Sequence, residues 1–196
     1  MDAIRCVIVG VGGQGNLLAS RLLGEAAVSA GVDVVVSEIH GMAQRGGVVE
    51  STVVLGDITS PIVSDGEADI LVGFEPLETL RTLKKCSPDT TIITNTAPLP
   101  PFTVAIGQGE YPPVDMILEK LKDKVKEVMA FDGNKLAEKS GNPLSLNMVM
   151  LGALIGSGKI PISADLMKKT IEQETKRVFL ESNLRAFDLG FNAVKG

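Results

Sequence analysis

One short segment near the start of the chain restricts its fold more than any other. Gly10, Gly12 and Gly15 form the pattern G-x-G-x-x-G directly after the apolar run 4–9. Behind this pattern, apolar residues recur at the spacing of an amphipathic helix until Gly31. A glycine turn between a buried strand and a helix is typical of α/β folds that bind nucleotides.

The rest of the chain continues the alternation of strands and helices. A second buried strand at 32–36 closes a βαβ unit. Further strands are expected at 48–55, 69–73, 90–94, 102–106 and 128–132, and helices at 76–85, 114–124, from Asn142-Pro143 onward and at 163–183. The last helix has the expected apolar face Leu166, Ile171, Val178 and Leu180. We therefore predict an α/β, Rossmann-like fold, with a mostly parallel sheet, helices on both faces, a helical C-terminal portion, and one domain spanning 1–196.

The glycine loop has a specific physical rationale. Gly10 permits the tight turn, Gly12 lets a ligand approach the backbone, and Gly15 permits close packing of the helix on the strand. The following helix N-terminus favours an anion. The alternative is that the glycines serve the turn alone. An NAD site also requires an acid after the second strand, and Glu38 stands there, although a second glycine-rich loop follows it at once.

This second loop, His40–Gly47, contains the only histidine of the chain. Loops at the carboxyl ends of strands gather in one crevice, so this loop is expected to face the first. The fork of Arg45 suits phosphate or carboxylate, and Asn95 is expected either in the same crevice or as a cap of its strand. A plain surface turn and a subunit contact remain alternatives for this loop. The candidate cofactor-binding residues are Gly10, Gly12, Gly13, Gln14, Gly15, His40, Gly41, Gln44, Arg45, Gly46, Gly47 and Asn95.

The small number of reactive side chains excludes several kinds of site. The 196 residues include two cysteines, one histidine and one tyrosine. A [4Fe–4S] cluster usually takes four thiolates, and a structural zinc ion takes four Cys or His ligands. The net charge of −5 argues against nucleic-acid binding. Two separate cysteines, with no leader or membrane-spanning segment in view, favour a cytoplasmic protein away from any membrane.

Two motifs in combination resemble a known family. Gly10–Gly15 reads G-x-G-G-Q-G and His40–Gly47 reads H-G-x-x-Q-R-G-G, and Asn147-x-x-x-Leu151-Gly152 follows later. This combination resembles the gamma domains of 2-oxoacid:ferredoxin oxidoreductases over essentially the whole chain. The second loop is most similar to that of small (beta) subunits in the indolepyruvate branch.

The resemblance implies an accessory subunit of an enzyme that oxidatively decarboxylates an aryl pyruvate to an acyl-CoA and reduces ferredoxin. Thiamine diphosphate, magnesium and [4Fe–4S] clusters are then expected in a large alpha subunit, and the isolated chain is expected to be inactive. Phe131-Asp132-Gly133-Asn134 lacks the first glycine of a thiamine diphosphate motif. Coenzyme A is the candidate ligand of the two loops. The exact 2-oxoacid, a direct coenzyme A contact, a homodimer of the isolated chain and any catalytic residue are left open.

Two other functions remain as alternatives. The glycine fingerprint and Glu38 are compatible with a self-contained NAD-dependent oxidoreductase. A non-enzymatic module that binds a nucleotide or coenzyme A is also compatible with the fold. The loop His40–Gly47 distinguishes the oxidoreductase subunit from a generic binding domain, because a generic binding domain does not require such a loop.

Overall fold

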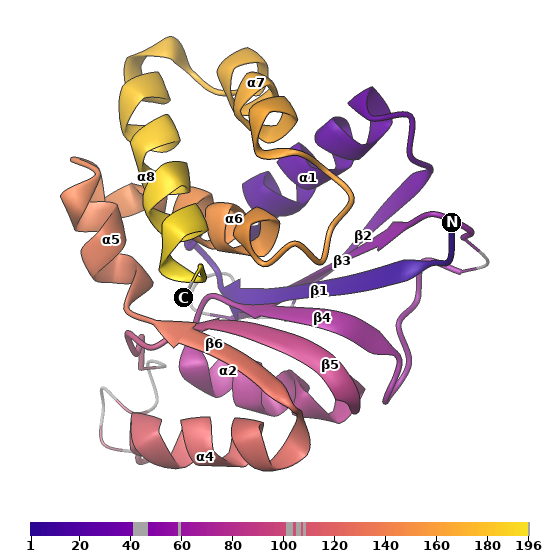
Figure 1. Ribbon diagram of the computed structural model, residues 1–196. Coiled ribbons are helices and arrows are strands. Elements are labelled where there is room, and N and C mark those ends of the chain that lie inside the picture. Colours follow the sequence, from indigo (N-terminus) through magenta and orange to yellow (C-terminus); the bar gives the residue numbers. More distant parts are fainter. Residues whose placement is uncertain (41–46, 59, 101–103, 105–106, 108, 196) are drawn as a thin grey trace.

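The structure is a computed structural model that describes residues 1–40, 47–58, 60–100, 104, 107 and 109–195. These residues form a six-stranded sheet in the order β2-β3-β1-β4-β5-β6 (Figure 1). The strands are β1 Ile4–Val11, β2 Val34–His40, β3 Val48–Leu55, β4 Ala68–Gly73, β5 Cys86–Asn95 and β6 Glu127–Phe131.

The sheet is mostly parallel, as predicted. β1, β4, β5 and β6 pair in parallel, whereas β3 is antiparallel to both of its neighbours, β1 and β2. The two strands of the expected βαβ unit therefore run in the same direction, but β3 is inserted between them. The physical reason is the short connection between β2 and β3, because so few residues can join antiparallel neighbours but cannot make a parallel crossover.

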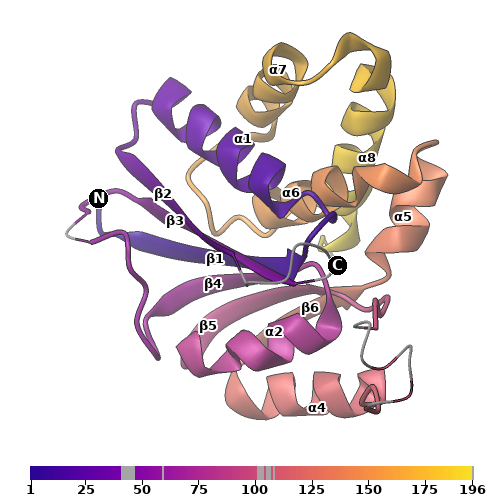
Figure 2. The same cartoon turned by 180° about the vertical axis from the view of Figure 1, so that it is seen from behind.

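Helices cover both faces of the sheet (Figures 1 and 2). One face carries α1 Asn16–Ser29, α5 Gly133–Lys139, α6 Leu146–Gly156, α7 Ala164–Glu174 and α8 Leu180–Ala193. The other carries α2 Pro76–Thr82 and α4 Val114–Lys124. Single 3₁₀ turns occur at Leu83–Lys85, Pro143–Ser145 and Arg177–Phe179. None of the helices in the described part of the chain is both long and apolar enough to cross a membrane.

The core has two apolar layers, one on each face of the sheet. Alternate residues of β1 serve the two layers, since Ile8 packs with the α1 and α6 side and Val7 with the α2 and α4 side. Helix α6 is apolar on all sides and is buried except at its last residue, as such a helix must be. Gly152 and Gly190 let α6 and α8 approach closely, because a Cβ at either glycine would overlap a backbone carbonyl of the other helix.

Two predictions about the C-terminal half are wrong, and one helix has no counterpart among the predicted elements. The helix predicted at 163–183 breaks after Glu174, where Thr175 and Lys176 are extended. The break turns α8 back onto α6, so that Phe187 is buried while Val178 is 80% exposed rather than on an apolar face. Helix α5 was not predicted, because its seven residues carry no clear apolar period.

The helix start predicted at Asn142 is confirmed in part, and the strand predicted at 102–106 is mostly outside the described residues. Asn142 does act as a cap, since its Oδ1 accepts a hydrogen bond from the Leu144 N–H, but it opens a 3₁₀ turn before α6 begins. The strand predicted at 102–106 lies, apart from Val104, outside the described residues.

Candidate functional site

The loop after β1 uses its glycines for both turning and packing. Gly13 and Gly15 have φ of +102° and +85°, which favour glycine. A Cβ on Gly10 would lie 2.9 Å from the Phe74 Cβ, so only glycine fits there. At Gly15 a Cβ would meet the side chain of Asn147 on α6. The neighbour of Gly15 is therefore a helix, whereas the sequence predicted packing on the strand.

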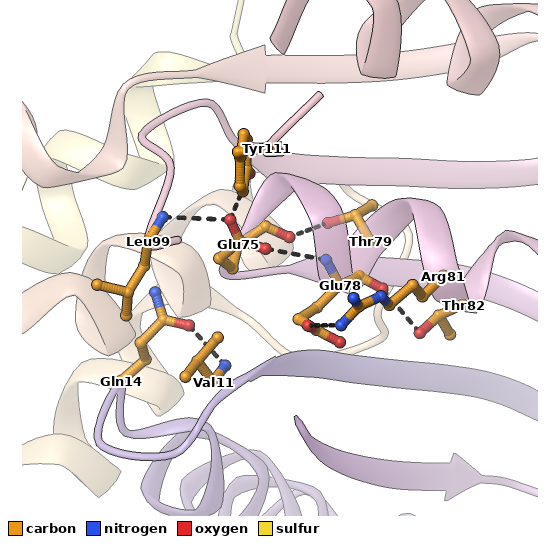
Figure 3. A network of polar contacts seen from close by, with 9 residues as sticks. All are labelled: Val11, Gln14, Glu75, Glu78, Thr79, Arg81, Thr82, Leu99 and Tyr111. Carbon is orange, nitrogen blue, oxygen red and sulfur yellow. Dashed lines mark hydrogen bonds and ion pairs between the residues drawn. The ribbon is translucent and has the colours of Figure 1, made fainter. Parts of the chain in front are cut away.

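The carbonyl of Phe74 joins the ends of three strands. It accepts hydrogen bonds from Gln14 Nε2 at 3.1 Å and from Asn95 Nδ2 at 3.0 Å. Gln14 Oε1 accepts in turn from the Val11 N–H at 2.8 Å (Figure 3). The amide of Gln14 thus serves the chain itself at both ends and holds the glycine loop against β4.

Asn95 is buried and saturated by hydrogen bonds. Its Oδ1 accepts from the N–H groups of Ala97 and Gly133 at 3.1 and 2.9 Å. Its Nδ2 also donates to Asn134 Oδ1 at 3.1 Å. These bonds match the structural alternative, in which Asn95 caps its strand and holds the start of α5. Its contact with a cofactor stays a prediction.

The two glycine-rich loops meet at the carboxyl edge of the sheet, as the sequence predicts. The Gly12 N–H donates to the Gly47 carbonyl at 2.9 Å, and Asn16 Nδ2 donates to the Val49 carbonyl at 3.0 Å. At Gly12, where the sequence predicts close approach of a ligand to the backbone, the N–H is thus engaged by the second loop. The predicted residues Gly41, Gln44, Arg45 and Gly46 lie outside the described residues, as does the side chain of His40.

The N-terminus of α1 presents donors at this edge. The first backbone bond of the helix runs from the Ala19 N–H to the Gly15 carbonyl. In the described part of the chain, the N–H groups of Asn16, Leu17 and Leu18 have no acceptor, and the first turn carries no acidic side chain. Unpaired N–H groups and the helix dipole, equivalent to about half a positive charge, suit an anion.

A cavity of about 370 Å³ opens beside this helix terminus. Leu18 of α1 and Asn147 of α6 form part of its wall, and Asn147 is also the neighbour of Gly15. The other wall comes from the α7–α8 connection, including Thr175 and Phe179. The cavity therefore combines apolar and amide surfaces with the charged residues Glu174 and Lys176, and Leu18 connects it to the N-terminus of α1.

Sequence reasoning missed a carboxylate next to this site. Glu75 is 1% exposed and caps α2, with Oε2 accepting from the Glu78 N–H at 2.9 Å. Its Oε1 accepts from the Leu99 N–H at 3.2 Å and the Tyr111 hydroxyl at 2.5 Å (Figure 3). The pair Glu75-Pro76 is a recognisable helix start. Nothing in the local pattern indicates Tyr111 as its partner.

Burial shifts the pKa values of Tyr111 and Glu78 in this cluster. Burial raises the pKa of the Tyr111 hydroxyl far above its usual range, and its hydrogen bond to Glu75 raises it further. Burial also raises the pKa of Glu78, against the lowering effect of the Arg81 guanidinium 2.7 Å away. Glu78 Oε2 is buried without a hydrogen-bond partner among the described residues. Tyr111 is therefore a fixed donor, and Glu75 its acceptor.

The described residues of this region show no group of side chains that could hold a metal ion. Within the described ranges, no three His, Cys, Asp or Glu side chains lie together as a metal ion would require. Glu38, the acid that an NAD site requires, is exposed on β2 and faces a groove beside α1.

Residues 5–193 match the model of the family described as pyruvate ferredoxin/flavodoxin oxidoreductase. The chain belongs to this family. This oxidoreductase chain is 41% identical to the indolepyruvate oxidoreductase subunit IorB of Methanothermobacter thermautotrophicus, over 95% of each chain. The resemblance predicted from the two glycine loops is confirmed, and the NAD-dependent and non-enzymatic alternatives are not favoured.

Solved structures share the fold of the oxidoreductase chain. The gamma subunit of a keto/oxoacid ferredoxin oxidoreductase from Geobacter sulfurreducens superposes with a TM-score of 0.71 at 23% identity, over 98% of each chain. A 2-oxoglutarate:ferredoxin oxidoreductase from Magnetococcus marinus gives a TM-score of 0.75 at 20% identity, with all of this chain matching 31% of that longer one. The predicted α/β architecture is therefore confirmed.

Proposed function

We propose that this chain is the small subunit of a ferredoxin-dependent oxidoreductase for aryl 2-oxoacids of the indolepyruvate class. The observation that carries the proposal is the 41% identity to an indolepyruvate oxidoreductase subunit across 95% of both chains. The contact between the two glycine loops, Gly12 N–H to Gly47 carbonyl, adds a structural reason for both motifs to occur in one chain.

The proposal includes a division of labour between subunits. Thiamine diphosphate, magnesium and [4Fe–4S] clusters belong to a large alpha subunit, which passes the electrons of the decarboxylation to ferredoxin. The present chain acts as one gamma-type domain over 1–196 in a cytoplasmic complex. Its contribution is a shaped surface with backbone donors at the carboxyl edge of the sheet.

Coenzyme A is the ligand that this edge fits best. When bound, coenzyme A supplies the thiol that accepts the acyl group. The phosphate groups suit the N–H donors of Asn16, Leu17 and Leu18 and the guanidinium of Arg45. The adjoining cavity beside Asn147, about 370 Å³ in volume, offers room for a further part of the ligand. The Magnetococcus marinus enzyme, which shares this fold, was solved with coenzyme A bound.

Co-expression with the large subunit of the same organism tests the function. We expect the two chains to elute together and to reduce ferredoxin with indolepyruvate and coenzyme A, and each chain alone to be inactive. Phenylpyruvate, pyruvate and 2-oxoglutarate, assayed in parallel, compare the substrate classes. A chain that forms no complex, or a complex that prefers a non-aryl 2-oxoacid, would contradict the proposal.

A further inference from the structure

Strand β2 lies at an edge of the sheet but has the composition of a central strand. It begins with Val34, Val35 and Val36, and continuous apolar runs are typical of strands covered on both faces. Natural edge strands are usually interrupted by lysine, proline or a bulge, which prevents pairing with other chains. β2 has no lysine, proline or bulge, its one carboxylate is Glu38, and its register with β3 is continuous from Val34 to His40.

Both faces of β2 expose apolar side chains. Val34 and Val36 face α1, where they line a groove of about 750 Å³ with Leu17 and Val28. Val35 and Ile39 lie on the opposite face, and Ile39 is 62% exposed. Val35 and Val36 are each 37% exposed. The valines of β1, by contrast, are buried. In the described part of the chain, nothing covers β2 on its outer side (Figures 1 and 2).

The rim of the groove is acidic. Arg21 lies there but is paired with Glu174 of α7 at 3.0 Å. Glu25 and Glu38 also line the groove, and neither forms an ion pair with any described residue. A segment that binds along β2 therefore meets apolar side chains in the groove and uncompensated negative charge beside it.

We propose that the outer edge of β2 binds an extended segment of the large subunit as an additional strand. Its alternate apolar side chains enter the groove beside α1, and a lysine or arginine lies next to Glu38. The inference rests on the proposed function, and it adds the surface and the chemistry of the contact. Pairing of this kind satisfies the outward backbone groups of β2 and places side chains of the added strand beside those of β2 on each face, which reduces the apolar surface exposed to water.

Charge favours a different chain over a second copy. In a two-fold pairing centred on Ser37, the two Glu38 side chains would lie diagonally across one face, about 7–8 Å apart, where like charges repel.

The position of β2 also favours the large subunit as the partner. The strand runs into the loop His40–Gly47, whose last residue bonds to Gly12. A strand added along β2 therefore ends beside the candidate coenzyme A site.

Substitutions on the two faces of β2 test the proposal in the co-expressed complex. Val36→Lys places a charge in the groove, and Ile39→Lys places one on the opposite face. We expect each to raise the Kd for the large subunit at least tenfold, and Glu38→Lys to raise it more than Glu38→Gln. Met116→Lys, an exposed position on α4 at the far face, is the matched control and should leave the Kd unchanged. Circular dichroism and thermal unfolding establish that each variant is folded.

Hydrogen exchange on the unmodified complex provides a measurement that needs no variant. We expect slower amide exchange in 34–40 when the large subunit is bound, compared with the chain alone. Equal exchange, or Val36→Lys and Ile39→Lys variants that bind like the unmodified chain, would overturn the inference. A homodimer of the chain alone that Val36→Lys dissociates would overturn it in favour of a second copy. Failure of the unmodified chain to bind the large subunit would instead overturn the proposed function, and this inference with it.

Discussion

The Glu75 carboxylate and the Tyr111 hydroxyl lie 2.5 Å apart, although 36 positions separate them in the chain. The same oxygen of Glu75 also accepts from the Leu99 N–H. One carboxylate thus holds both ends of the segment 99–111 against the start of α2 (Figure 3). Because Phe74 precedes Glu75 and bonds to Gln14, this anchor is continuous with the glycine loop.

Removal of the tyrosine hydroxyl should destabilise the fold. Tyr111→Phe deletes a hydrogen bond to a charged group, which is worth about 1.5–3 kcal/mol when buried, and partial exposure places the expected loss at the lower end. Urea unfolding measures it. In a double-mutant cycle with Glu75→Gln, we expect a coupling of more than about 0.5 kcal/mol. Additive effects of the two substitutions would show that the contact does not form in solution.

Glu78 should make stability depend on pH. Burial raises the pKa of Glu78 in the folded state above the ordinary value of 4.5. Folding therefore favours its protonated form. The stability that it contributes is complete below pH 4.5 and is lost as the pH rises through the folded-state pKa. We expect the free energy of unfolding of the unmodified chain to fall, relative to Glu78→Gln, as the pH rises from about 4 to about 7. Parallel pH profiles in urea titrations would contradict this.

Both thiols should be unreactive in the native chain. Burial raises the pKa of Cys6 to about 12 and that of Cys86 to about 11, and only the thiolate reacts quickly. With a colorimetric disulfide reagent at pH 8, we expect slow labelling of the folded chain and rapid labelling of two thiols in guanidinium. Rapid labelling of the native chain would show that one of these sites opens easily.

The contact between α6 and α8 should not tolerate a methyl group. Gly190→Ala would overlap the Val149 carbonyl, so we expect a loss of about 1–3 kcal/mol from overpacking, despite the better helix propensity of alanine. Thermal unfolding measures the effect. Gly109→Ala is the control, because among the described residues the nearest atom to its added Cβ, on the Val104 side chain, is 3.9 Å away and the effect should be small. A neutral Gly190→Ala would mean that the two helices are farther apart.

A carboxylate introduced at the start of α1 should weaken the binding of coenzyme A. Leu17→Glu places negative charge in the first turn, where it stabilises the helix but competes with a phosphate for the same donors. Because Leu17 also lines the groove beside β2, the assay uses enough large subunit to saturate the complex. Under this condition, we expect the KM for coenzyme A to rise about tenfold while the melting temperature is maintained. Leu17→Gln, of nearly equal size, is the uncharged control. An unchanged KM in Leu17→Glu would remove α1 from the coenzyme A site.

The sequence predicted helices and strands well where the apolar periodicity and the residues that start or end an element indicate the same boundaries. The third strand and the helix at 114–124 have the predicted boundaries, Val48–Leu55 and Val114–Lys124. Proline at the first position of α2 and the cap at Asn142 also occur where expected. These features depend on contacts between residues a few positions apart, which the sequence displays directly.

The sequence by itself determined the glycine turn after β1, the α/β class and the meeting of the two glycine loops. Only the tertiary structure decided the insertion of β3 between β1 and β2, the break after Glu174 and the pairing of Glu75 with Tyr111. It also decided that the amides of Gln14 and Asn95 are engaged within the chain. The physical reason is that these outcomes depend on strand pairing, burial and hydrogen bonds between distant residues, whose free energies exceed local propensity and leave no periodic signal in the chain.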